Sequence, residues 1–303
     1  MTVSTEVRPT IGRQGLFSRM SDSAKTRTYI SAGVRHLFLA AFGIIMVYPL
    51  LWLVFSTFKP NVEIFSSASL LPQTWEFSHW RQGWSAIRGH TFGTFFLNSA
   101  VISGLSIVGT LISCSLAAYA FSRFRFPLKR VWFSILLVTM MLPSQVLMVP
   151  RYILFVNLGW IDSFAPLTVP NFFGSSAFFI FLITQFIRGI PYDLDESSFI
   201  DGCSRVRFLW SILLPLMRPA LFTAALFTFM WTWQDFMGPL IYITSVRLYP
   251  MPLALNLFVD AQAAVNWGAL HSMMVFSIAP IIILFFFAQR YFVEGIVTTG
   301  MKG

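Results

Sequence analysis

The chain has 303 residues, of which 56% are hydrophobic and only 11% are charged. Soluble domains carry about a quarter charged residues, so this composition excludes an ordinary soluble domain and predicts a surface that largely faces lipid. The formal net charge of +9 would indicate a nucleic-acid partner in a soluble protein. Here the basic residues lie between long apolar runs, which indicates a membrane surface and no nucleic acid as partner.

The N-terminal residues 1–36 are polar and basic, and they contain no compact apolar stretch followed by a small-residue cleavage site. We therefore expect a retained cytoplasmic tail over 1–36 and one transmembrane domain over 37–303.

Six apolar stretches are long enough to cross a bilayer core as helices, which takes roughly 20 residues. They are residues 37–58, 95–121, 131–150, 164–187, 219–243 and 269–289. Backbone polar groups in lipid must be satisfied within each segment. The sequence therefore predicts an all-α, polytopic membrane protein with six transmembrane helices.

The distribution of basic residues predicts the orientation. Of the 21 Lys and Arg residues, 16 lie in the tail 1–36, the loops 122–130 and 188–218, and the end 290–303. Since cytoplasmic segments are enriched in Lys and Arg, we expect both termini on the cytoplasmic side of the membrane.

Small residues form a stripe along the second stretch, at alternating spacings of four and three that place them on one helix face. They are Ser99, Ser103, Ser106, Thr110, Ser113, Ala117 and Ala120. The stripe could line a polar path, but small residues also let membrane helices approach closely, and we favour the packing seam.

The sequence offers no catalytic constellation. None of the four lysines follows a glycine, so the chain lacks a phosphate-binding Gly-Lys-Ser/Thr loop, and the four histidines are scattered without metal-ligand spacing. We expect no catalytic residue, no metal and no cofactor bound by this chain.

Asp235 is the one Asp, Glu, Lys or Arg residue within the six stretches. A carboxylate inside a membrane helix is costly and is a functional candidate by default. Helical spacing would place Trp231, Asp235 and Gly238 on one face, next to Gln234, where an aromatic ring and a carboxylate suit a sugar. The alternative is that Asp235 caps a neighbouring helix and touches no substrate.

The loop 188–218 has the strongest local signals. Pro191 and Asp193 can begin a short helix, and Gly202 can end it in the left-handed conformation. Ser204 can cap a second short helix, which Pro215 terminates. The loop is therefore predicted to be a cytoplasmic helix-turn-helix between the fourth and fifth spans.

At this loop the sequence resembles the permease subunits of bacterial ABC importers. Their hallmark is Glu-Ala-Ala, three residues, Gly, nine residues, Ile-x-Leu-Pro, and the matching residues at that spacing are Glu196, Gly202, Ile212, Leu214 and Pro215. Ser197 and Ser198 replace the two usual alanines, a small-for-small change.

Other segments resemble the carbohydrate branch of these permeases, and specifically its maltose-permease G-type members. They are Ser56-Thr-Phe-Lys-Pro60, Asn98-Ser99, the run from Ala117 to Arg125, and the run from Glu294 to Gly303. The resemblance covers nearly the whole chain beyond the tail.

The resemblance implies a multi-pass subunit of the bacterial cytoplasmic (inner) membrane. Its implied partners are a second permease subunit, two ATPase subunits that bind ATP and Mg, and an extracytoplasmic solute-binding protein that delivers a sugar or oligosaccharide. The loop 188–218 would be the coupling loop that contacts the ATPase, with Asp201 and Arg205 among its contact residues.

Two other classes of protein remain as alternatives. A secondary transporter for a small polar solute usually shows paired repeats and several intramembrane charges, whereas this chain has one such charge and no visible repeat. A membrane enzyme would need clustered catalytic side chains. The sequence does not identify the solute, because relatives of this type carry sugars, uronic-acid oligomers and glycerol phosphates.

Overall fold

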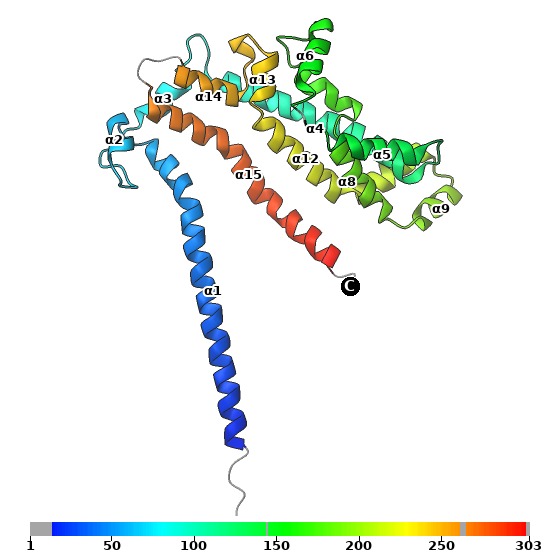
Figure 1. Ribbon diagram of the computed structural model, residues 1–303, viewed down its shortest axis with the longest axis horizontal. Helices are drawn as coiled ribbons and strands as arrows, with labels where there is room; N and C mark the ends of the chain where they lie inside the picture. The colour runs from blue at the N-terminus through cyan, green and yellow to red at the C-terminus, as the bar shows by residue number, and fades with distance from the viewer. Residues whose placement is uncertain (1–13, 144, 261–264, 301–303) are drawn as a thin grey trace, which may run out of the picture.

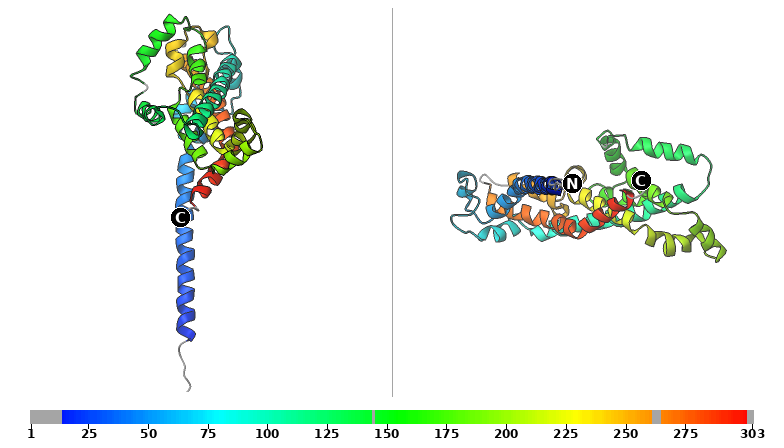
Figure 2. Two further views of the ribbon diagram at one scale, coloured as in Figure 1. Left: turned by 90° about the vertical axis from the view of Figure 1, so that its right-hand side faces the viewer. Right: turned by 90° about the horizontal axis from the view of Figure 1, so that it is seen from below.

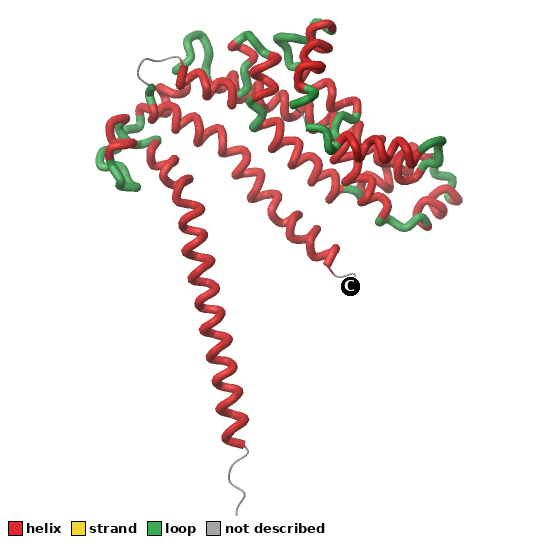
Figure 3. The backbone as a smooth tube through the Cα atoms, viewed as in Figure 1, coloured by secondary structure: helices red, strands yellow, loops and turns green. Residues whose placement is uncertain are grey.

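The computed structural model describes residues 14–143, 145–260 and 265–300. Over these ranges the chain forms helices joined by turns and loops, without a β-strand (Figure 3). The all-α class expected from the sequence is confirmed. The first 13 residues of the expected tail and the last three of the run from Glu294 to Gly303 lie outside the described residues.

Helix α1, Gln14–Ser56, stands apart from the rest of the molecule except at its C-terminal end, which contacts α15 (Figures 1 and 2). Its most apolar window has a mean hydropathy of 2.4, and none of that window is buried against the rest of the chain. A helix that is apolar all round has the composition of a membrane span. The helix runs through residue 36 without a break, so secondary structure does not mark the expected boundary between tail and span.

Helix α4 is central to the rest of the fold, where it packs against helices from three later parts of the sequence. The bounds are Phe92–Arg123 for α4, Val169–Phe173 for η1, Ala177–Arg188 for α8 and Arg218–Trp233 for α12. The apolar part of α4, residues 95–121, contains no proline and only two glycines, Gly104 and Gly109. This composition is compatible with an unbroken membrane helix.

The small residues of α4 form a packing seam. The Ser113 hydroxyl donates to the carbonyl of Asn171 at 2.7 Å, and the Ser106 hydroxyl donates to the carbonyl of Leu167 at 3.4 Å. Gly109 approaches η1 so closely that an added Cβ would lie 2.7 Å from the ring of Phe172. The favoured interpretation of the stripe is confirmed, since small side chains permit this approach.

The stretch 131–150 does not form the single helix that the sequence predicts. It contains α5, Lys129–Thr139, and the start of α6, Met148–Asn157, with turns at residues 140–143 and 145–147. Pro143 lies between them, and proline lacks an amide donor and disfavours the helical conformation of the residue before it. Hydropathy alone does not register this interruption.

The fourth and fifth stretches are also interrupted. In the fourth, Gly174 adopts a φ of 68° between η1 and α8. In the fifth, α12 ends at Trp233 and a separate helix α13 begins at Met237. The short helices in and directly after these two stretches are α7, Ala165–Thr168, α13, Met237–Tyr242, and η3, Val246–Leu248.

The predicted number of six spanning helices is not confirmed. Four described segments are long and apolar enough to cross a membrane: Gly33–Ser56, Phe92–Arg123, Ala165–Arg188 and Trp267–Gln289. A fifth is reached only if Arg205–Leu216 and Arg218–Trp233, bent by 76°, count as one span.

The two ends of the molecule have separate hydrophobic cores. One core lies where α4 begins, and its aromatic contacts include the rings of Phe92 and Phe258, 6.2 Å apart. The helices gathered at that end are α2, Asn61–Ser66, α3, Ser78–Trp84, α14, Met251–Asp260, and the start of α15, Trp267–Gly300. The other core lies where α4 ends, beside the loop 188–218.

Candidate functional site

The loop 188–218 contains two short helices with a tight reversal between them. Helix α9, Asp193–Ile200, ends at Gly202, whose φ is 77°. The Cys203 amide donates to the Ser198 carbonyl at 2.9 Å and the Gly202 amide to that of Phe199 at 3.1 Å, the pair of bonds of a Schellman motif. The left-handed glycine that the sequence predicts is therefore present.

The second helix of the loop begins as predicted and ends differently. The Ser204 hydroxyl accepts from the Arg207 amide at 3.3 Å and caps α10, Arg205–Phe208. A π-helical turn η2, Leu209–Leu213, and α11, Leu214–Leu216, then continue the helix through Pro215. The chain ends this run at Met217 and bends by 76° into α12.

One side of the loop is exposed and largely uncovered. Glu196, Ser197, Asp201, Gly202 and Arg205 are all exposed. Between them lie large exposed apolar side chains: Ile200 at 85%, Val206 at 67% and Trp210 at 62%. An exposed apolar patch rimmed by polar residues is typical of a protein-binding surface.

Other matching residues face inward and hold the loop in place. Ser198 is buried, and its hydroxyl donates to the carbonyl of Asp195 at 2.8 Å. Ile212 and Leu214 pack against the core at the end of α4. Pro215 is exposed. The hallmark therefore combines residues that shape the loop with residues that present its surface.

The sequence did not single out the ion pair that fastens this loop to α4. Arg123 Nε lies 3.0 Å from Asp195 Oδ1, and the two side chains are 3% and 6% exposed. Burial raises the pKa of the Asp195 carboxyl, and the positive charge of Arg123 opposes that shift. The available signal was that Arg123 lies in the run from Ala117 to Arg125, which resembles the permease family.

Asp235 lies at a helix break, which corrects the expectation of one continuous face. Trp231 belongs to α12, Gly238 belongs to α13, and Asp235 lies between the two helices. Its Oδ1 accepts from the Gly238 amide at 3.0 Å, and a Cβ at position 238 would collide with the carboxylate. Asp235 therefore caps α13, as the alternative interpretation expects, while Gln234 is exposed.

Trp231 lines a cavity of about 1430 Å³. The cavity lies between α5, α6, the break before α8, and α12. Its lining includes the aromatic rings of Trp132 and Phe173 together with Ser175 and Arg151. Aromatic faces with a few polar groups suit a solute that offers both C–H faces and hydroxyls. Gln234, Asp235 and Gly238 are not among the lining residues.

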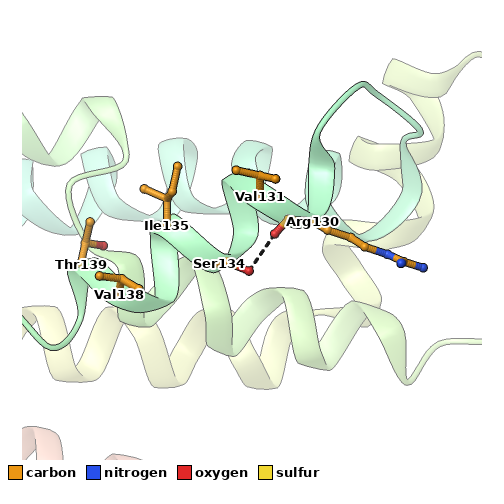
Figure 4. A pocket seen from close by; sticks show the side chains of 6 residues that line it. All are labelled: Arg130, Val131, Ser134, Ile135, Val138 and Thr139. Carbon is orange, nitrogen blue, oxygen red and sulfur yellow. Dashed lines mark hydrogen bonds between the residues drawn. The ribbon is translucent and has the colours of Figure 1, made fainter.

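A second depression, of about 380 Å³, lies along α5 alone (Figure 4). Its six lining residues run from Arg130 to Thr139, and the Ser134 hydroxyl donates back to the Arg130 carbonyl at 2.9 Å. Because every lining residue comes from one helix, this is an open helix face and not a solute site.

Comparisons with known proteins agree with the resemblance at the loop. A family model described as the binding-protein-dependent transport system inner membrane component matches residues 109–298. The chain is 34% identical to YurM of Bacillus subtilis, a probable ABC transporter permease protein, over 94% of this chain and 93% of that protein. It is 31% identical to the galactooligosaccharides transport system permease protein GanQ of Bacillus subtilis, over 92% and 98%.

The fold is also that of a solved transporter. The chain resembles a chain in the crystal structure of a bacterial ABC transporter involved in the import of the acidic polysaccharide alginate. The TM-score is 0.77 at 23% identity, covering 87% of this chain and 97% of that one.

Proposed function

The chain belongs to the family of binding-protein-dependent transport system inner membrane components, and from this premise we propose that it is the permease subunit of an importer for a sugar or oligosaccharide. The names of GanQ and of the alginate transporter support a carbohydrate as the solute. An extracytoplasmic binding protein delivers it to a pair of permease subunits. ATP and Mg²⁺ bind to separate ATPase subunits.

The observation that carries this proposal is the surface of the coupling loop, residues 188–218. Its exposed face combines the Glu196 carboxylate with the apolar side chains of Ile200, Val206 and Trp210. A subunit without a phosphate-binding loop needs a mechanical connection to the ATPase, and a protruding, rigidly capped helix pair supplies one. Nucleotide and loaded binding protein then bias the same two-state equilibrium of the spans.

We also propose six crossings with both termini in the cytoplasm. In this arrangement α5 and α6 together form a third, discontinuous crossing, and the bent pair that ends in α12 contributes to the fifth. Broken helices are tolerated at membrane depth where protein or a water-filled cavity surrounds the freed backbone groups. The cavity lined by residues of α5 and α6 supports this arrangement.

Loss of the Glu196 side chain should weaken the ATPase contact. Truncating one partner of a desolvated charge pair typically costs about 2–5 kcal/mol. We expect Glu196→Ala to insert normally while retaining less ATPase through purification and taking up less solute. Glu76→Ala, at a partly exposed acid far from the coupling loop, is the matched control and should retain the ATPase. Full retention and uptake in Glu196→Ala would exclude this contact.

The solute path predicts a different phenotype at Trp231. This side chain is 53% exposed, and its ring lies 6.0 Å from that of Phe178, which also lines the cavity. We expect Trp231→Ala to lower uptake severalfold with the ATPase fully retained, because stacking of one aromatic ring is worth about 1 kcal/mol. Trp231→Phe should recover part of the loss.

A substitution at Asp235 is the control for the effect of Trp231→Ala on solute uptake. Asparagine keeps an oxygen that can accept from the Gly238 amide, so Asp235→Asn should preserve the cap and leave uptake unchanged. A loss of uptake in Asp235→Asn, with Trp231→Ala normal, would assign the solute to the carboxylate instead.

A further inference from the structure

Arg123, the last residue of α4, contacts three successive parts of the coupling loop. Its Nη2 donates to the carbonyl of Ile190 at 2.9 Å. Its guanidinium carbon lies 4.3 Å from the centre of the Tyr192 ring, and its Nε lies 3.0 Å from Asp195 Oδ1. One side chain therefore connects the end of a membrane helix to the start of α9.

Two tyrosine hydroxyls form further hydrogen bonds between the end of α4 and the coupling loop. The Tyr192 hydroxyl donates to the carbonyl of Ser122 at 3.1 Å, which is the residue before Arg123. One helical turn earlier, the Tyr119 hydroxyl donates to the carbonyl of Arg205 at 3.3 Å. Both helices of the coupling loop, α9 and α10, are thus attached to the last turn of α4.

Stability alone does not account for a buried ion pair at this place. Desolvation of two charges offsets much of their attraction, and well-packed apolar residues often do as well. What an ion pair with a planar guanidinium does provide is a fixed orientation, because its donors are held in a rigid plane. Here Nη2 of Arg123 donates to the Ile190 carbonyl, the Tyr192 ring lies against the guanidinium, and the Asp195 carboxylate lies at ion-pair distance from Nε without forming a hydrogen bond to it.

The last turn of α4 also reaches the solute cavity. Phe121, two residues before Arg123, is one of the cavity's lining residues. From there α4 runs through the middle of the fold, in contact with α8, α12 and η1. A displacement delivered at Arg123 therefore acts on the helix that packs against α8, α12 and η1.

We infer that Arg123 is a positioning residue that makes the coupling loop and α4 move as one rigid body, so that ATPase closure displaces α4. This inference rests on the proposed function of the loop. Arg123 does not contact the ATPase or the solute in this role. Its loss therefore leaves the ATPase attached and hydrolysing ATP, while less solute is moved for each ATP consumed.

The first test compares the amount of solute transported per ATP hydrolysed in the assembled transporter. We expect Arg123→Gln and Asp195→Asn to lower this ratio by about fivefold or more, with ATPase retention unchanged. Arg125→Gln, at an exposed arginine two residues away, is the matched control and should keep the wild-type ratio. The charge-swapped pair Arg123→Asp with Asp195→Arg should recover part of the loss.

A second measurement detects rigidity directly. Spin labels at Asp193 on α9 and Leu116 on α4, both exposed, report the distance between the two helices. In the wild type, adding a non-hydrolysable ATP analogue should leave this distance distribution narrow and unshifted. In Arg123→Gln the distribution should broaden and shift on nucleotide binding, a change that a general loss of stability would not make dependent on nucleotide.

The outcomes separate this inference from the proposed function. Suppose that Arg123→Gln transports solute per ATP hydrolysed within about twofold of wild type, while Glu196→Ala loses the ATPase. This result overturns the inference about Arg123 and leaves the proposed role of the coupling loop unaffected. Wild-type behaviour of Glu196→Ala as well excludes the proposed ATPase contact of the coupling loop. If Arg123→Gln fails to accumulate, Arg123→Lys is measured, since it keeps the charge and lacks the planar fork, and a wild-type ratio there overturns the inference.

Discussion

The carboxylate of Asp162 ties together two segments that are far apart in the sequence. Its Oδ1 accepts from the amides of Thr244 and Ser245 at 3.0 and 2.7 Å, and its own amide donates to the carbonyl of Tyr242 at 2.8 Å. Hydrogen bonds from the Ser245 hydroxyl and from the amides of Ser245 and Thr244 lower the pKa of Asp162 from its ordinary 3.8 to about 2. The loop after α6 is thereby fastened to the residues after α13.

This lowered pKa predicts how the stability contributed by Asp162 depends on pH. Because the folded state holds the proton less tightly, the contribution is fully present above pH 3.8 and is lost as the pH falls toward 2. We compare the wild type with Asp162→Asn, since asparagine tolerates the φ of 60° at this position. The difference in melting temperature should be constant above about pH 5 and should shrink below the ordinary pKa. A difference that does not change down to pH 2 would contradict the assignment.

Local residue roles could be predicted from the sequence, and long-range partners could not. The left-handed Gly202 and the Ser204 cap depend on neighbours within a few positions, so residue type and spacing identify them. Arg123 and Asp195 lie more than 70 positions apart, and either could have been a solvated surface charge. Asn98 likewise donates to the carbonyls of Arg247 and Tyr249, which no local pattern specifies.

The close packing of α4 against η1 predicts how a substitution at their contact changes the stability of the subunit. An alanine Cβ at Gly109 would lie 2.7 Å from the Phe172 ring and 3.0 Å from the backbone of Asn171. Overpacking of this kind typically costs about 1–3 kcal/mol, so Gly109→Ala should lower the stability of the purified subunit. Unfolding monitored in detergent by circular dichroism measures the change.

Gly104 is the matched control on the same helix. No atom lies within 4 Å of a Cβ placed there, so Gly104→Ala should leave the subunit's stability unchanged or raise it slightly. Adding Phe172→Leu to Gly109→Ala should recover only part of the loss, because the Asn171 backbone remains in contact. Equal stability of the two alanine variants would show that the seam is not tightly packed.

Helix breaks explain why the predicted elements were only partly right. Hydropathy identified apolar stretches, and the second stretch, which has no internal proline, forms one helix over its whole length. In 131–150 and 219–243 an apolar run contains a residue that ends or caps a helix, namely Pro143 or Asp235. Composition averaged over about 20 residues gives no weight to such a single position.

At the scale of the whole molecule, orientation is the property to test. With the native cysteines Cys114 and Cys203 replaced, single cysteines are introduced at exposed positions 68, 85, 127 and 207. A membrane-impermeant thiol reagent applied to intact cells should label positions 68 and 85, and should label 127 and 207 only after the membrane is opened. Labelling of position 207 in intact cells would reverse the proposed topology.

The separation of α1 from the body has a consequence for biosynthesis. The first span leaves the ribosome before any other, yet its C-terminal end packs against α15, where the rings of Trp52 and His271 lie 5.5 Å apart. Those two residues are separated by more than 200 positions. Helix α1 must therefore remain in the lipid without its packing partner until nearly all of the chain has been translated. Its mean hydropathy of 2.4 lets it do so as an independent membrane helix. Truncating the chain before α15 should therefore leave α1 inserted but without its partner, accessible to any other helix that offers a complementary face.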